Sequence, residues 1–295
     1  MKKKILIVSS LLVTALLFQM CDYVRNANQT ATSTTQQAGK VYRKVLVEDY
    51  TGHKCGNCPR AAETLTQLEG IYGSQIVPMA VHAGFFAVVT PSSVPPYPTD
   101  LRSTAGTDYD NTFGNSIAGN PNGLVNRKNH DSASLFIKAY SAWGAAVASM
   151  NTQLADFQIK ITNTFNTSSN QLTSVVTSKA LNGKTGPFNL VVLLTEDSII
   201  AEQEDYSLPT GPPNYQRIPN YLFNHVLRGA INSSWGDPIF PGVVNKNDSI
   251  VKTYNYTLPS TYKYKHCHVV AFIYDANTAN LTYYEVLQVE TKELY

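Results

Sequence analysis

Two cysteines separated by two residues are the part of this sequence best suited to redox chemistry. Residues 55–58 read Cys-Gly-Asn-Cys and stand directly before a helical pattern. A helix N-terminus favours an anion, so it raises the thiolate fraction of a cysteine placed there. His53 and Lys54 would lower the pKa of the Cys55 thiol further. We therefore expect Cys55 to act as the nucleophile and Cys58 to resolve mixed disulfides.

A strand and a helix must hold this cysteine pair in place. Residues 41–50 have the pattern of a strand of mixed burial, and Asp49 lies on it, six residues before Cys55. A buried acid at this spacing is suited to exchanging a proton with the resolving thiol. Residues 61–69 have helical spacing, and Pro59 fits the first turn of such a helix. The order predicted is strand, turn, CxxC, helix.

The next segments complete a thioredoxin-like pattern. Residues 75–83 form a second predicted strand, and Pro121 stands just before a short apolar run. Thioredoxin folds carry a cis-proline at this point, packed against the cysteine pair, so we expect a cis bond before Pro121. An apolar stripe over 134–154 predicts a closing helix. The segment 85–110, rich in proline, is predicted to be an irregular insertion that can cover the cysteine pair.

The second half of the chain has a different pattern. From Asp156 onward, short alternating apolar runs are bounded by clusters of Asn, Gly, Pro and Ser. This pattern predicts an antiparallel β-sandwich. The expected fold class is thus an α/β thioredoxin-like domain over 41–155, followed by a β-sandwich domain over 156–295.

Two further groups of residues in this half carry polar chemistry. Asn224, His225 and Arg228 lie close together in sequence, and either Glu196 or Asp197 is a candidate ion-pair partner for Arg228. They form either a recognition surface or a structural cluster that fixes a loop between the sheets. Cys267 alternates with His266 and His268 in a predicted strand, so it is expected to be a buried free cysteine. We predict no metal and no organic cofactor.

The first 20 residues have the features of a signal peptide. Lys2 to Lys4 precede an apolar run that ends near Phe18, which is short for a helix that crosses a bilayer. Cys21 follows the run where bacterial lipoproteins carry their acylated cysteine, so we predict lipidation there. Residues 22–40 are polar and predict a flexible tether.

Composition limits the classes of function. The 295 residues are 43% hydrophobic and only 15% charged, with a net charge of +2. A core is therefore expected, whereas a nucleic-acid-binding protein would need clustered Lys and Arg. We expect the partners to be the membrane, through the N-terminal lipid, and a protein partner or substrate in the envelope.

Several motifs of this chain resemble those of the outer-membrane-protein-28-related family. The family joins a thioredoxin-like domain to a C-terminal β domain, so the resemblance implies this architecture and a location at the outer membrane, on either its periplasmic or its outer side. It does not bring a settled activity. The motifs lie at 48–52, 55–59, 81–84, 119–121 with 126–127, 194–199 with Gln203, and 224–228.

Two functions fit these patterns. The first is a thiol–disulfide oxidoreductase of the cell envelope, in which Cys55 and Cys58 react, Asp49 transfers a proton and Pro121 positions the substrate. The second is an adaptor without catalysis, in which the disulfide is a structural staple and the β domain binds a protein partner. Fold alone does not choose between them.

Overall fold

The computed structural model describes residues 39–93, 96–129, 136–211 and 215–295. The predicted signal peptide, the predicted lipidation site at Cys21 and all but the last two residues of the predicted tether lie outside these ranges. No helix within them is long and apolar enough to cross a lipid bilayer.

The strand–helix–strand unit around the cysteine pair forms as predicted. β1 (Val45–Thr51) and β2 (Ile76–His82) are parallel neighbours, joined by α2 (Cys58–Tyr72). β3 (Asn122–Val125) runs antiparallel along the other side of β1. The parallel pair requires a crossover, and α2 supplies it.

These three strands belong to a larger sheet that also includes strands from the second half of the chain. Among the described residues it has nine strands, in the order β16-β15-β8-β11-β2-β1-β3-β4, with β12 paired to β8 outside this path. The further members are β4 (Lys138–Ala139), β8 (Phe188–Glu196), β11 (Val226–Ala230), β12 (Asp237–Phe240), β15 (Cys267–Asp275) and β16 (Val286–Glu293).

The two halves meet where β11 lies between β2 and β8. Val226 of β11 is in register with Ala80 on one side and with Glu196 on the other. The sheet therefore crosses the boundary predicted between 155 and 156. Among the described residues, strand pairing therefore joins the two halves of the chain in one sheet.

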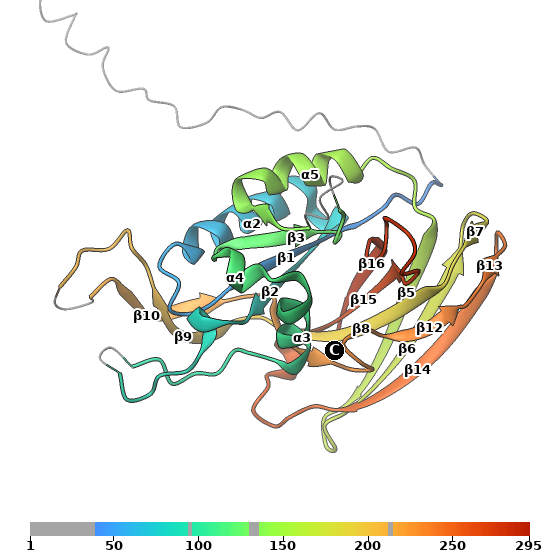
Figure 1. The fold of residues 1–295 in the computed structure, drawn as a ribbon. Coiled ribbons are helices and arrows are strands. Elements are labelled where there is room, and N and C mark those ends of the chain that lie inside the picture. The colour runs from blue at the N-terminus through green and yellow to red at the C-terminus, as the bar shows by residue number, and fades with distance from the viewer. Residues whose placement is uncertain (1–38, 94–95, 130–135, 212–214) are drawn as a thin grey trace, which may run out of the picture. The chain divides into compact units, whose positions relative to one another are not determined.

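Helices cover both faces of the first half of this sheet. α2 and α5 (Trp143–Met150) pack on one face around Val45, Val47 and Trp143. α3 (Thr104–Phe113) packs on the other face, where Leu46, Tyr50 and Tyr109 are buried. Figure 1 shows α2 and α5 together on one side of β1 and β3, with α3 on the opposite side.

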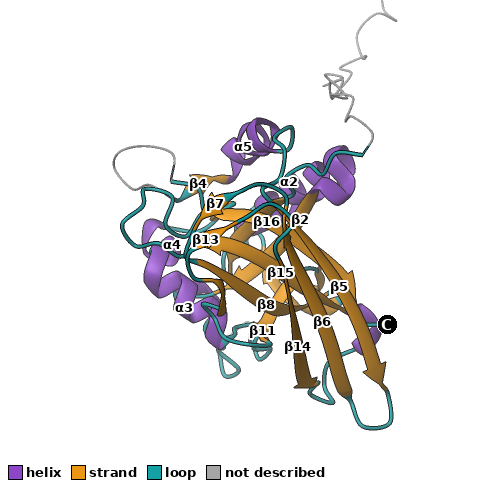
Figure 2. Ribbon diagram, turned by 90° about the vertical axis from the view of Figure 1, so that its right-hand side faces the viewer, coloured by secondary structure: helices purple, strands orange, loops and turns teal. Residues whose placement is uncertain are grey.

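The second half is β-rich, as predicted, and two of its sheets face one another. β5 (Phe157–Asn166), β6 (Gln171–Ala180) and β14 (Ser249–Thr257) form an antiparallel three-stranded sheet (Figure 2). Its apolar side chains share a core with Leu190 and Leu194 of β8 and with Val269 of β15. The alternate residues of β8, Val191 and Leu193, point into the core on the α3 side.

Two predicted segments differ from the structure. The first two residues of the closing helix predicted over 134–154 lie outside the described ranges. In the described part the helix is shorter, because β4 and the 3₁₀ turn at 140–142 precede α5 and only residues 143–150 are α-helical. The insertion predicted to be irregular over 85–110 contains the start of α3 at Thr104. Ser103 caps α3 by accepting a hydrogen bond from the backbone N–H of Gly106, which starts a helix inside the predicted loop.

The remaining elements are short, apart from one hairpin that bears on the cysteine pair. That hairpin is β9 (Ile199–Glu204) paired antiparallel with β10 (Arg217–Phe223). The others are α4 (Asn115–Ala118), β7 (Lys184–Thr185), β13 (Val243–Val244) and the 3₁₀ turns η1 (Gly73–Gln75), η2 (Phe85–Ala87), η3 (Tyr140–Ala142) and η4 (Tyr264–His266).

Candidate functional site

Cys55 and Cys58 form a disulfide at the N-terminal end of α2. Their Cα atoms are 5.4 Å apart. α2 begins at Cys58 with Pro59 in its first turn, and the N–H of Cys58 donates to the carbonyl of Cys55. The loop between β1 and α2 therefore presents both sulfurs at the end of the helix that carries its positive dipole. Each cysteine is only 2% exposed.

The hairpin β9–β10 covers this disulfide. The amide Nε2 of Gln203 donates to the carbonyl of Cys55 at 3.0 Å, and the N–H of Tyr206 donates to the carbonyl of Gly56 at 2.9 Å. The Tyr206 ring lies so close to Gly56 that a Cβ there would come within 2.2 Å of it. Hydrogen bonds and ring packing together explain why the two sulfurs are buried.

The insertion after β2 covers the residues just before the disulfide. The N–H of Lys54 donates to the carbonyl of Phe86, and the His53 ring stacks on Tyr97 with 5.3 Å between centroids. Burial lowers the pKa of His53, so its ring is neutral at pH 7. The lowered pKa weakens the positive charge expected of His53 beside Cys55, and the insertion contacts the two residues just before the disulfide.

Asp49 lies on β1, the strand predicted to carry it, with its side chain toward α2. Asp49 is only 3% exposed, and its Oδ1 atom has no hydrogen-bond partner among the described residues. Burial raises the pKa of Asp49 from 3.8 to about 8. This carboxyl is therefore mostly protonated at neutral pH and able to accept or release a proton close to it.

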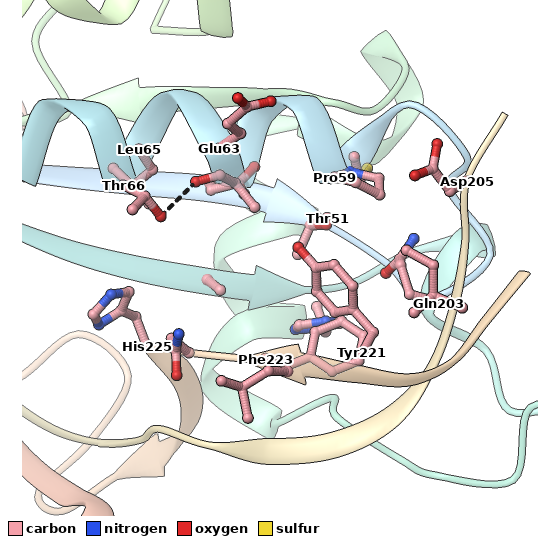
Figure 3. Close-up of a pocket in the computed structure, with 18 of the residues that line it drawn as sticks. Thr51, Pro59, Glu63, Leu65, Thr66, Gln203, Asp205, Tyr221, Phe223 and His225 are labelled. Atoms are coloured by element: carbon pink, nitrogen blue, oxygen red, sulfur yellow. Dashed lines mark hydrogen bonds between the residues drawn. The ribbon is translucent and has the colours of Figure 1, made fainter. Parts of the chain in front are cut away.

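A cleft of about 340 Å³ connects Asp49 with Cys58. Figure 3 shows it between α2 and the hairpin β9–β10, with Gln203 and Asp205 toward one end and His225 at the other. Its floor is formed by the ends of β1 and β2, and its outer wall by the hairpin side chains Tyr221 and Phe223. The arrangement places the cysteine pair beside an enclosed, partly apolar space.

His82 is a second buried titratable group on the cleft. Its ring is packed edge-on against Phe223, and neither Nδ1 nor Nε2 has a hydrogen-bond partner among the described residues. Burial lowers the pKa of His82 to about 3, so the ring is neutral at physiological pH. The side chains of His82 and Asp49 line the same cleft because β1 and β2 are parallel and in register.

His225 closes the far end of the cleft through two acidic residues. Its Nε2 lies 3.2 Å from a carboxylate oxygen of Glu69, and its Nδ1 lies 3.3 Å from Asp197. Burial opposes protonation of the ring, but the hydrogen bond with Glu69 and the charge of Asp197 outweigh it and raise the pKa of His225. This contact ties α2 to the loop between β10 and β11.

The polar cluster predicted around 224–228 is assembled by the fold. Arg228 lies 3.2 Å from the carboxylate of Glu196 and stacks over the Tyr262 ring at 4.1 Å. Asn224 accepts a hydrogen bond from the backbone N–H of Ser198. These contacts hold the turns at the ends of β8 and β10 together, which is what the structural interpretation of this cluster expects.

Pro121 precedes β3, and the bond between Asn120 and Pro121 is cis, as predicted. Asn122 is paired with Tyr50, so Pro121 lies at the end of β1, where the loop to the disulfide starts. The predicted nucleophile, acid and proline are thus all carried by the same end of the β1–β2–β3 unit.

Cys267 is a buried free cysteine, as predicted. It lies in the core between the two facing sheets, and burial raises the pKa of its thiol to about 12. Such a thiol is unreactive at neutral pH. Within the described ranges, no group of three or more His, Cys, Asp or Glu side chains is arranged to hold a metal ion.

Three functional candidates were not predicted as site residues from the sequence. His82 and Gln203 belong to the motifs of the family resemblance, and Tyr221 to none. A histidine that ends an apolar strand, as His82 does after residues 76–81, is a signal that would have indicated a buried ring. Gln203 reaches Cys55 from 148 residues away, and local patterns do not report such contacts.

This chain shares its fold with a solved structure. HBP35 of Porphyromonas gingivalis matches with a TM-score of 0.62 at 18% identity, over 87% of this chain and 76% of that chain. A domain of the outer membrane lipoprotein Omp28 from Porphyromonas gingivalis matches at 24% identity, over 48% of this chain and 88% of that one, with a TM-score of 0.30. No curated protein matches.

The sequence profile of one family covers most of the described chain. The family is described as outer membrane protein Omp28, and its profile matches residues 107–294. The match spans the end of α3, β3 and the whole β-rich half, including the hairpin that covers the disulfide. This chain therefore belongs to the Omp28 family of outer membrane proteins.

Proposed function

We propose that this protein is a thioredoxin-like thiol–disulfide exchange protein of the cell envelope. The observation that carries the proposal is the position of the disulfide at the start of α2, beside a buried acid with a pKa of about 8. The order β1, CxxC, α2, β2, cis-proline, β3 also supports a thioredoxin-like unit within the larger sheet. A disulfide that only stabilises a fold needs no proton acceptor beside it.

The exchange reaction follows from this geometry. In the reduced protein, the Cys55 thiolate attacks a disulfide of the partner, forms a mixed disulfide and displaces one partner thiolate. The ionised form of Asp49, a minor fraction at neutral pH, accepts the proton of Cys58, and the Cys58 thiolate then attacks the Cys55 sulfur. The Cys55–Cys58 disulfide re-forms, and the second partner sulfur leaves as a thiolate that takes up a proton. The partner gains two electrons, which the cysteine pair loses.

The cover over the disulfide favours a second candidate, an adaptor in which the bond is only a staple. Gln203 and Tyr206 bind the Cys55–Gly56 backbone, and both sulfurs are buried. Exchange therefore requires the hairpin β9–β10 to move away from the loop. A structural disulfide requires no such movement.

The reduction potential of the Cys55–Cys58 pair tests the proposal. Exchange proteins have potentials from about −270 to −120 mV, whereas structural disulfides lie below about −300 mV. Equilibration of the purified protein with glutathione or dithiothreitol buffers, followed by alkylation and mass spectrometry, gives the value. We expect a potential within the exchange range. A value below about −300 mV would instead support the adaptor function.

We also propose that Cys21 carries lipid and anchors the protein at the outer membrane. The apolar run before Cys21 and the outer membrane family support this. Stable attachment requires more than one acyl chain. Mass spectrometry of the mature N-terminus should show an acylated Cys21, and Cys21→Ala should release the protein from the membrane fraction. An unmodified peptide that continues through residue 21 would contradict the anchor.

A further inference from the structure

The cleft beside the disulfide contains buried polar atoms that the protein itself does not satisfy. Among the described residues, Oδ1 of Asp49 and both ring nitrogens of His82 have no hydrogen-bond partner. Asp49 is 3% exposed and His82 is 1% exposed. Buried polar groups are normally paired, and an unpaired one costs free energy. These three atoms are closed to solvent, so a molecule bound in the cleft would reach them when the Asp49 and His82 side chains rotate toward it.

The walls of the cleft are suited to an apolar body. Tyr221 and Phe223 of β10 face Leu65 of α2 across the space, and Ile218 lies farther along the same wall. A volume of about 340 Å³ fits the lower range of small-molecule sites. Mostly apolar walls with a few fixed polar groups are the usual composition of such sites.

The charges around the cleft favour a cation. Glu69 and Asp205 lie toward opposite ends, and Asp49 lies on the floor. None of the described residues that line the cleft is Lys or Arg, and His225 is already paired with Glu69. An anion would meet the carboxyl groups of Asp49 and Asp205 without a free positive partner, since Glu69 and His225 are already paired with each other. A cation would meet these groups and two aromatic rings, which attract positive charge.

We propose that this cleft binds a small apolar molecule that carries a primary amine. The apolar part lies against Tyr221 and Phe223, and the ammonium group donates hydrogen bonds to Asp49 and to the unprotonated nitrogen of His82. An ammonium has three donors and no acceptor, which suits these two groups. Burial keeps His82 neutral, so one ring nitrogen remains an acceptor. A bound cation would also favour the ionised form of Asp49.

Three indole compounds of similar size and different charge test this proposal. They are tryptamine, tryptophol and indole-3-propionate, titrated by calorimetry into the oxidised full-length protein, so that no thiol exchange takes part. We expect tryptamine to bind at least tenfold more tightly than tryptophol, and indole-3-propionate to bind most weakly. The proposal is overturned if indole-3-propionate binds as tightly as tryptamine, or if tryptamine shows no binding at about 5 mM.

Substitutions in the cleft separate charge recognition from shape. Asp49→Asn and Glu69→Gln should each weaken tryptamine binding roughly tenfold and change tryptophol binding less than twofold. Tyr221→Leu should weaken both compounds. The matched control is Glu293→Gln, which removes an exposed charge far along β16 and should change neither. If Asp49→Asn does not fold, Glu69→Gln still decides, because unchanged tryptamine binding in that variant contradicts the charge argument.

Discussion

Glu48 and Asp49 are adjacent on β1, yet their carboxyl groups have opposite surroundings. Glu48 points to the α3 side, where Arg127 donates two hydrogen bonds to it at 2.7 and 2.8 Å and both side chains are 0% exposed. Asp49 points to the α2 side and has an unpartnered oxygen on the cleft. The pleat of one strand thus separates a carboxylate that is paired with an arginine from an acid with an unpartnered oxygen.

Aromatic rings complete the site around the ion pair. The Arg127 guanidinium lies 4.1 Å from the Tyr109 ring centroid and 4.9 Å from that of Phe272. Burial opposes its charge, but Glu48 and the surrounding groups hold the pKa of Arg127 above its usual value. The comparison teaches that burial alone does not distinguish structure from function. The partners distinguish these two carboxyl groups: Arg127 holds Glu48 in place, whereas Oδ1 of Asp49 has no partner among the described residues.

Breaking the ion pair should have the largest effect. Arg127→Met leaves Glu48 buried and unpaired, so we expect the free energy of unfolding to fall by about 3–5 kcal/mol. Urea unfolding followed by circular dichroism measures this. The double variant Glu48→Leu with Arg127→Met should recover most of the loss, since no lone charge remains.

The control for this prediction is an exposed ion pair. Arg102 and Asp100 are 2.8 Å apart at the surface, and Arg102→Ala should cost less than about 1 kcal/mol. If Arg127→Met costs no more than Arg102→Ala, Glu48 and Arg127 are not a desolvated pair.

Removing the unpaired acid should instead increase the free energy of unfolding. A carboxyl whose pKa rises from 3.8 to about 8 on folding disfavours the folded state, increasingly as pH rises from about 4 to 8. Asp49→Asn should therefore stabilise the protein by about 4 kcal/mol at pH 7 and have little effect at pH 4. Unfolding at pH 4, 6 and 8 tests this. The exposed control is Glu293→Gln, whose effect on stability should not depend on pH. If the effect of Asp49→Asn is equally independent of pH, the burial of Asp49 is contradicted.

Uncovering the disulfide should have a smaller effect, on rate. Tyr206→Ala removes the ring that packs over Gly56, so we expect phosphine reduction of the Cys55–Cys58 bond to become roughly tenfold faster. Thiol labelling over time measures the rate. Tyr215→Ala, an exposed tyrosine on the same hairpin segment, is the matched control and should leave the rate unchanged. Equal rates in all three proteins would show that Tyr206 does not limit access.

The smallest effect is expected at Cys267. Cys267→Ala removes one buried sulfur from the core between the facing sheets and should cost about 1 kcal/mol. Thiol labelling of the native protein should not change, because the Cys267 thiol has a pKa of about 12 and is buried. Rapid labelling of Cys267 in the native protein would contradict this assignment.

The sequence predicted the elements that local patterns encode. The strand with Asp49, the helix after the cysteine pair, the cis bond before Pro121 and the β-rich second half all follow from periodicity, turn residues or a short motif. Contacts between distant segments were not predicted. β11 joins the halves through one register pair at Val226, and its sequence does not show that its neighbour is β2.

The cleft was missed for the same physical reason. Its floor comes from β1 and β2, whereas its outer wall comes from a hairpin more than 100 residues later in the chain. β10 has mostly partly exposed side chains, so its pattern of burial does not indicate a strand that covers a site. The cysteine motif marks where chemistry can occur, but not what surrounds it.

The late position of the hairpin has a consequence for how the disulfide first forms. β9 begins at Ile199, which is 141 residues after Cys58. During synthesis the two thiols therefore exist for a long interval before the segment that will enclose them has been made. An oxidant that meets the growing chain reaches both sulfurs without displacing Gln203 or Tyr206. Oxidation of the nascent chain therefore does not require the hairpin to move, whereas reduction of the folded protein does.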